Sequence, residues 1–88
     1  MKVEYRKKFL KELSKLPAEY RKRIEMFVFE ELPNFSSLSD VGAVEKMTGY
    51  KNYFKIRFGS YRVGIKKESD YIIVETVKHR KDIYKYFP

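Results

Sequence analysis

The sequence predicts an α+β domain: a short N-terminal strand and an αα-hairpin packed on a three- to four-stranded antiparallel sheet, with a short C-terminal helix. Two alternating runs around Gly59-Ser60 predict a β-hairpin, while residues 6–32 have apolar residues at helical spacing. The chain has 88 residues, 43% of them hydrophobic, which is enough for one core and too few for two. We therefore expect a single domain over residues 1–88.

The first third of the chain predicts one strand and two helices. Met1–Tyr5 alternates apolar and charged residues, as a strand does. Helical periodicity follows over Arg6–Leu16 and over Ala18–Leu32, and Pro17 is suited to open the second helix. The apolar stripes are Phe9, Leu10, Leu13 and Leu16 in the first helix, and Tyr20, Ile24, Phe27, Val28 and Leu32 in the second.

Two apolar residues, Met26 and Phe29, lie off the second stripe. One interpretation is that they contact a neighbouring element of the same domain. The other is that they form an exposed patch for a protein partner.

The remainder predicts a sheet and a final helical turn. Pro33–Gly42 is rich in turn-forming residues and predicts a loop, after which Ala43–Met47 predicts a brief strand. Lys67–Asp70 predicts a turn before the β-branched run Tyr71–Lys78. Apolar residues of that run fall on both parities, so we expect a central strand covered on both sides, one of them only partly. Lys81–Phe87 predicts one or two helical turns.

The hairpin over residues 53–67 predicts one apolar and one cationic face. A two-residue turn with glycine first fixes the register, so that Phe58 lies opposite Tyr61 and Arg57 opposite Arg62. Like charges placed opposite each other are destabilising. We therefore interpret the cationic face as a binding site for an anion. Its residues are Lys55, Arg57, Arg62 and Lys66, and the apolar face has Phe54, Ile56, Phe58, Tyr61, Val63 and Ile65.

The net charge of +8 is concentrated in the second half of the chain. Residues 46–88 contain 11 Lys/Arg and 4 Asp/Glu, whereas residues 1–45 contain 9 and 8. This asymmetry favours a polyanion partner such as nucleic acid over a basic surface kept for solubility. The chain has no cysteine, which is typical of the cytoplasm, and no apolar run near the roughly 20 residues that span a membrane.

The end of the last strand supplies further candidate groups. Glu75, Val77 and His79 share a parity, so we expect Glu75 to pair with Arg62 and His79 to face the cations. Arg80 follows directly, with an aromatic, Tyr84, at the rim. The candidate site is Lys55, Arg57, Arg62, His79, Arg80 and Tyr84.

These residues suit phosphodiester chemistry without a metal or other cofactor. Fixed cations neutralise a phosphate, a histidine transfers protons near neutral pH, and an aromatic stacks on a base. A lone histidine, no cysteine and scattered carboxylates argue against zinc or magnesium sites. Metal-free cleavage most simply uses the substrate's own 2′-hydroxyl, which restricts the substrate to RNA. Structural interpretations stay open: His79 as a strand-end residue with a satisfied hydrogen bond, and Tyr84, Tyr86 and Phe87 as aromatics closing a core.

The motifs N-Y-F-K-I-R-F-G-S-Y-R-V-G-I and V-K-H-R-K-D-I-Y-K-Y-F-P resemble the RelE branch of the RelE/ParE toxin superfamily. The N-terminal F-L-K-E-L-S-K-L-P followed by A-E-Y-R-K-R-I is similar as well. The resemblance implies a microbial-ribonuclease-like sheet and a toxin of a type II toxin–antitoxin system. It implies metal-independent cleavage of messenger RNA in the ribosomal decoding site, by 2′-hydroxyl attack on the adjacent phosphate.

The resemblance also assigns roles to the candidate residues. Lys55 and Arg57 correspond to the basic pair that activates the 2′-hydroxyl and neutralises the phosphate, and Arg62 to the arginine that stabilises the transition state. Arg80 corresponds to the arginine assigned to leaving-group protonation or charge stabilisation, and Tyr84 to the tyrosine that stacks on the codon base. Since arginine is a poor proton donor, His79 is the preferred proton-transfer group.

The implied partners are the ribosome with its messenger RNA and an acidic, partly disordered, RelB-like antitoxin that wraps the helices. Two alternatives remain open. A ParE-like toxin would inhibit DNA gyrase with the same fold, and a catalytically silent homologue would only bind its antitoxin.

Overall fold

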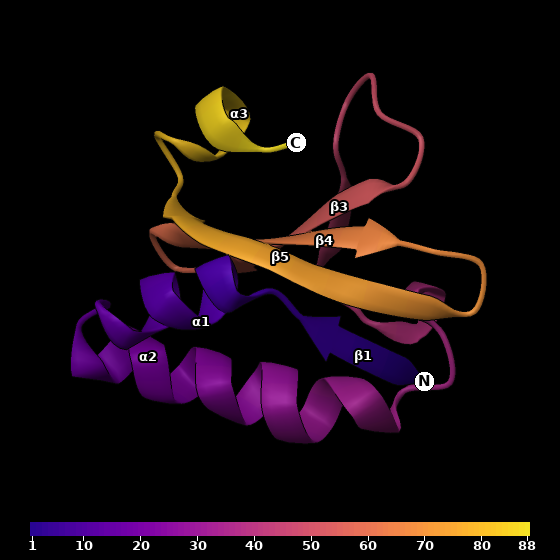
Figure 1. The fold of residues 1–88 in the computed structure, drawn as a ribbon, viewed down its shortest axis with the longest axis horizontal. Helices are drawn as coiled ribbons and strands as arrows, with labels where there is room; N and C mark the ends of the chain where they lie inside the picture. The colour runs from indigo at the N-terminus through magenta and orange to yellow at the C-terminus, as the bar shows by residue number, and fades with distance from the viewer.

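The computed structural model describes residues 1–88, and its elements follow the predicted order. None of the helices is long and apolar enough to cross a membrane. The elements are β1 (Lys2–Tyr5), α1 (Lys7–Ser14), α2 (Ala18–Glu25), β2 (Val44–Lys46), β3 (Tyr53–Phe58), β4 (Tyr61–Lys67), β5 (Tyr71–His79) and α3 (Ile83–Tyr86) (Figure 1).

The second helix of the chain continues beyond the end of α2. Pro17 caps its N-terminus as predicted, and a π-helical segment, Met26–Glu31, continues it. Phe29 lies against Tyr5 of β1, with ring centroids 4.9 Å apart, and remains 39% exposed. Met26 is 53% exposed. The two apolar residues outside the stripe therefore differ. Phe29 contacts a neighbouring element, and Met26 is a surface side chain.

The sheet has five strands in the order β1-β5-β4-β3-β2. Strands β2 to β5 pair antiparallel, as predicted, and β1 adds a parallel edge strand in which Val3 lies opposite Ile72. A parallel partner requires a long crossover, and here the whole chain from α1 to β4 separates the two strands. The direction of β1 therefore depends on contacts far away in sequence.

A β-bulge interrupts the pairing of β4 with β5. Gly64 lies opposite Thr76 and Ile65 opposite Val74, so Glu75 has no opposite residue in β4. The extra residue changes the parity of β5 at this point. For this reason Val74 and Val77, which are three residues apart in the sequence, both lie in the main core.

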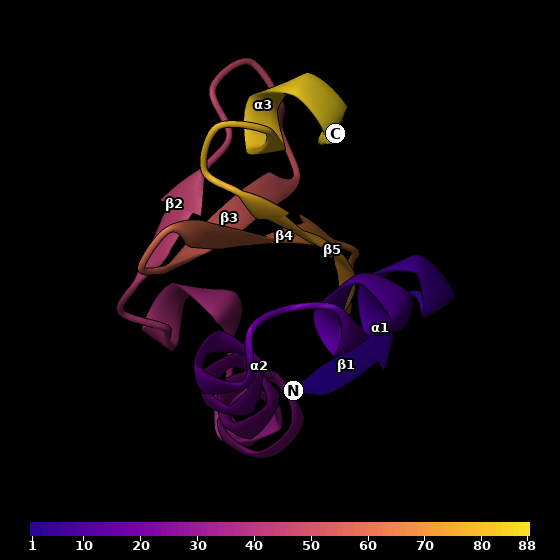
Figure 2. The same cartoon turned by 90° about the vertical axis from the view of Figure 1, so that its left-hand side faces the viewer.

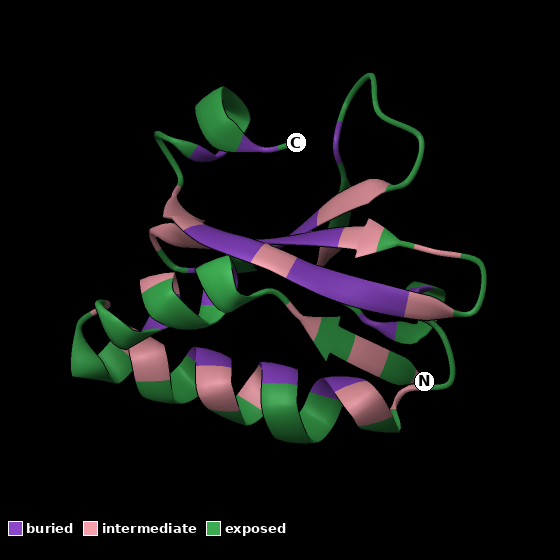
Figure 3. Cartoon of the chain, in the orientation of Figure 1, coloured by how far each residue is buried: buried purple, intermediate pink, exposed green.

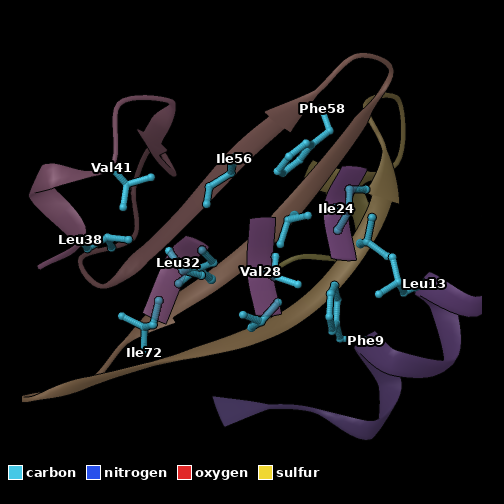
Figure 4. Packing of buried hydrophobic residues seen from close by; sticks show 14 residues of the cluster. Phe9, Leu13, Ile24, Val28, Leu32, Leu38, Val41, Ile56, Phe58 and Ile72 are labelled. Atoms are coloured by element: carbon cyan, nitrogen blue, oxygen red, sulfur yellow. The ribbon is translucent and has the colours of Figure 1, made fainter. Parts of the chain in front are cut away.

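The main core lies between the sheet and helices α1 and α2. Side chains of these helices meet those of the strands (Figure 4), and buried residues follow β4, β5 and the side of α2 that faces the sheet (Figure 3). Figure 2 shows α3 on the opposite face of the sheet from α1 and α2. The core cluster is Phe9, Leu13, Ile24, Val28, Leu32, Leu38, Val41, Ile56, Phe58, Val63, Ile65, Ile72, Val74 and Val77.

A second apolar cluster attaches α3 to the outer face of the sheet, the face opposite α1 and α2. It consists of Met47, Ile83 and Phe87, with Tyr53 packed against it. The Phe87 ring lies directly on Gly64, where a Cβ atom would come within 2.7 Å of it. Glycine in β4 thus makes room for the ring that holds the C-terminal helix in place.

Candidate functional site

The β3–β4 hairpin has the predicted turn and register. Gly59 takes a φ of +57°, which favours glycine at the first central position of the turn. Arg57 lies opposite Arg62 and Lys55 opposite Gly64. Alternation places Lys55, Arg57 and Arg62 on the outer face, beside the segment that carries α3.

Lys55 is a buried cation, with 7% of its surface exposed. Its Nζ lies 4.0 Å from the centre of the Tyr84 ring and 3.9 Å from Glu45 Oε2. Tyr84 is 63% exposed, so its ring covers the lysine and remains open to solvent. A cation–π contact and one carboxylate together hold this ammonium.

Glu45 on β2 is the site residue that the sequence reasoning missed. Its Oε1 accepts a hydrogen bond of 3.2 Å from Arg57 Nη2, and its Oε2 lies near Lys55. β2 was predicted, and pairing it with β3 places Glu45 opposite Lys55. The signal in the sequence was a glutamate within the predicted strand, which pairs with the strand that carries Lys55 and Arg57.

Arg62 is held by the turn of its own hairpin. Its Nη1 donates hydrogen bonds to the carbonyl oxygens of Gly59 (2.7 Å) and Tyr61 (2.9 Å). Burial, with the nearby charges of Arg57 and Arg80, lowers the pKa of Arg62, and Glu45 opposes this effect. The guanidinium nonetheless stays charged at any physiological pH.

Arg80 lies beside Lys55, Arg57 and Arg62, and these four residues are called the cationic cluster below. The turn that holds Arg62 also holds the backbone of Arg80. Its backbone N–H donates a 2.7 Å hydrogen bond to the carbonyl of Ser60. The side chain is exposed and close enough for its charge to act on Arg62. Three consecutive carbonyls, those of Gly59, Ser60 and Tyr61, therefore position two arginines.

Two predictions about β5 were wrong. Glu75 pairs with Arg6, at 3.5 Å, and not with Arg62, because the bulge displaces it from the expected register. His79 lies opposite Tyr61, and their rings meet edge to face with centroids 5.6 Å apart. Tyr61 packs against the main core, so alternation places the His79 ring on the helix-covered side and away from the cations.

The three C-terminal aromatics have different environments. Phe87 closes the second apolar cluster, as the structural interpretation had it, with 6% of its surface exposed. Tyr84 and Tyr86 are exposed, at 63% and 55%. Lys78 Nζ lies 5.1 Å from the Tyr86 ring centre, whereas Tyr84 contacts Lys55. Only Tyr84 of the three joins the cationic cluster.

The sequence profile described as "ParE toxin of type II toxin-antitoxin system, parDE" matches residues 3–84. The chain belongs to the RelE/ParE toxin superfamily. It is 47% identical over 89 residues to Toxin RelE3 of Methanocaldococcus jannaschii, with both chains covered in full.

Solved structures of the superfamily have the same fold. In the RelB–RelE antitoxin–toxin complex from Methanococcus jannaschii, the matching chain is 45% identical, with a TM-score of 0.79 over 98% of this chain and 100% of that one. The isolated Escherichia coli RelE toxin is 20% identical, with a TM-score of 0.65 over 96% of this chain and 90% of that one, and supports the fold alone.

The arrangement in this RelE/ParE toxin is suited to binding an anion through two of its oxygen atoms at once. Lys55 and Arg57 already converge on the two oxygens of one carboxylate. Arg62 and Arg80 add fixed positive charge beside them. No group of three or more His, Cys, Asp or Glu side chains gathers anywhere in the structure as ligands for a metal ion.

Proposed function

We propose that this toxin is a ribosome-dependent, metal-independent endoribonuclease that cleaves messenger RNA by 2′-hydroxyl attack on the adjacent phosphate. The observation that carries the proposal is the convergence of Lys55, Arg57, Arg62 and Arg80 on one face, with the exposed Tyr84 ring against Lys55. The similarity to Toxin RelE3 supports the same function.

Glu45 supports phosphate binding between Lys55 and Arg57. Its carboxylate oxygens lie 3.9 Å from Lys55 Nζ and 3.2 Å from Arg57 Nη2. A phosphate presents similar paired oxygens, so the same two cations can bind it once Arg57 releases Glu45. We infer that Glu45 holds these side chains in place in the free protein and competes with the substrate.

In the proposed cleavage step the cations have different roles. The Lys55 ammonium stabilises the 2′-oxygen as its proton passes to solvent water, and the 2′-oxygen forms a bond to phosphorus as the bond to the 5′-oxygen breaks and the 5′-oxygen takes a proton from water. The products are a 2′,3′-cyclic phosphate and a 5′-hydroxyl end. Arg62, fixed by two carbonyls, stabilises the charge of the transition state, together with Arg80. Tyr84 stacks on a base.

The open geometry of the site supports a requirement for the ribosome. The cations lie on a sheet face beside a single helical turn, and Arg57, Arg80 and Tyr84 are exposed. Such a surface binds phosphates but does little to orient one scissile bond, and orientation supplies a large part of rate enhancement. A messenger held in the decoding site arrives already oriented.

A RelB-like antitoxin is the proposed partner. The matching chain at 45% identity comes from a RelB–RelE complex, and further matches come from such complexes as well. A chain of net charge +8 favours an acidic partner. Adding the antitoxin should block cleavage, and cleavage that continues in a tight complex would refute a neutralising role.

The second candidate is a gyrase-inhibiting toxin, which the ParE description of the matching profile favours. It would need the fold but not the cluster around Lys55 and Arg62. A catalytically silent antitoxin-binding domain is the third candidate. These readings differ in what arrests growth: degraded messages, damaged DNA, or neither.

The deciding experiment is a cleavage assay on a ribosome programmed with a codon in the decoding site, with magnesium at the level that the ribosome needs. Wild type is compared with Arg62→Ala, and free messenger is the control. A codon-centred cut with a 2′,3′-cyclic phosphate end, lost in the variant, supports the ribonuclease. No cut from protein that still arrests growth would favour gyrase instead.

A further inference from the structure

We propose that His79 is a positioning residue whose Nδ1 atom fixes the backbone of Arg80, and that it is not a proton-transfer group. The inference rests on the proposed ribonuclease activity, since Arg80 is one of its cations. It replaces the role that the sequence suggested for this histidine.

The first observation is the hydrogen bonding of three consecutive backbone N–H groups. Arg80 donates to the Ser60 carbonyl (2.7 Å), Lys81 donates to His79 Nδ1 (3.2 Å), and Asp82 donates to the His79 carbonyl (2.8 Å). His79 therefore supplies two of the three acceptors. The peptide units on both sides of the Arg80 Cα are restrained, which limits where its side chain can start.

The second observation is that the imidazole ring is itself held. It meets the Tyr61 ring edge to face at 5.6 Å, and Tyr61 in turn meets Tyr20 of α2 at 4.8 Å. This row of three aromatic rings connects α2 to the end of β5. A ring fixed on the helix-covered side can serve as a stable anchor for the loop that follows it.

Direction and protonation argue against proton transfer. His79 is the last residue of β5 and lies opposite Tyr61, whereas Arg80 lies in the turn that follows the strand. Arg80 acts on Arg62, while His79 lies with Tyr61. Moreover, Nδ1 accepts the Lys81 N–H only when it carries no proton. Nδ1 therefore accepts the hydrogen bond that anchors the loop and is not free to accept a proton from the substrate.

The test uses two substitutions that separate the nitrogens of the ring. The Oδ1 atom of Asn occupies the place of Nδ1 and can accept from Lys81, whereas the Gln oxygen lies one bond further out, near the place of Nε2. We compare His79→Asn, His79→Gln and wild type in single-turnover cleavage on programmed ribosomes. Amide hydrogen exchange of Lys81 is measured by NMR on the same proteins.

For the positioning role, His79→Asn should keep cleavage within about threefold of wild type, with the Lys81 amide still protected. His79→Gln should lose roughly 10- to 100-fold, with faster exchange at Lys81, because a misplaced group costs catalysis on this scale. Substrate KM should change little, since the Arg57 and Lys55 contacts are intact.

Three outcomes would overturn the proposal. One is an equal loss of roughly 10²–10⁴-fold in both variants, the scale of a missing proton-transfer group. Another is a His79→Gln variant as active as wild type. The third is a Lys81 amide that exchanges in wild type as fast as a free one. That measurement needs no variant and no cleavage, so it decides the positioning role even if wild type cuts no RNA and the proposed function fails.

Discussion

Lys55 and Tyr84 join the hairpin to the C-terminal helix: the lysine Nζ lies 4.0 Å from the centre of the tyrosine ring. Lys55 is 7% exposed and Tyr84 is 63% exposed, so one face of the ring covers the ammonium while much of the ring stays open to solvent. A base stacked on the open face would bring its phosphate beside the cationic cluster. This contact links substrate recognition to the proposed chemistry.

The first prediction concerns the Tyr84 ring. Tyr84→Ala should lower single-turnover cleavage by roughly 10- to 100-fold, because a base–aromatic stack is worth about 1–3 kcal/mol. Tyr84→Phe keeps the ring and should stay within about threefold of wild type. Tyr86→Ala is the matched control, an exposed tyrosine of the same helix that lies away from Lys55. Equal losses in the two alanine variants would argue against a specific role for Tyr84.

The second prediction concerns Glu45. Because Arg57 must release this carboxylate to bind a phosphate, Glu45→Gln should lower KM by roughly two- to fivefold and leave kcat within about threefold. Glu68→Gln, which removes the 3.2 Å ion pair with Lys66 outside the cluster, serves as the control. A kcat reduced by roughly 10²-fold or more would instead identify Glu45 as the proton acceptor.

The third prediction concerns Glu12 of α1 and the pH dependence of stability. Its Oε1 accepts hydrogen bonds from Thr76 Oγ1 and from the Val77 N–H on the edge of β5 beyond β1, and its Oε2 pairs with Lys78 at 2.7 Å. Burial alone would raise the pKa of Glu12, but the bonds from Lys78, Thr76 and Val77 outweigh it and lower the pKa. The carboxylate therefore stabilises the fold above its ordinary pKa, and this contribution is lost as pH falls through the lowered value.

Accordingly, Glu12→Gln should reduce the free energy of unfolding by about 1–2 kcal/mol at neutral pH. The difference from wild type should shrink as the pH falls below 4.5, the ordinary pKa of the group. Urea unfolding at several pH values measures both effects. Glu19→Gln on the exposed side of α2 is the control, and a difference that grew on acidification would contradict the assigned network.

The fourth prediction concerns Gly64. A methyl group there would lie 2.7 Å from the Phe87 ring, so Gly64→Ala should displace α3 and cost about 1–3 kcal/mol of stability. Cleavage should fall as well, because α3 carries Tyr84. Gly42→Ala, where a Cβ atom meets nothing within 4 Å, should change stability by less than about 0.5 kcal/mol. Identical urea midpoints for the two variants would show that Phe87 does not depend on this glycine.

Much of the site could be predicted because it is local. The Gly59-Ser60 turn, the Arg57–Arg62 pairing and the cationic face follow from alternation over residues that are close in sequence. The helices, the antiparallel strands and the final helical turn follow from periodicity in the same way. Glu45 was missed, although it was within reach, because its neighbours depend on which strand pairs with β3.

The sequence alone thus determined the α+β class, the hairpin register and the gathering of cations, since each depends on backbone geometry over a few residues. Only the tertiary structure decided that β1 runs parallel to β5, that Glu75 occupies a bulge and that His79 faces Tyr61. A single extra residue in β5 reverses the parity on one side of it. That residue is accommodated by contacts between segments distant in sequence, and no local pattern reports such contacts.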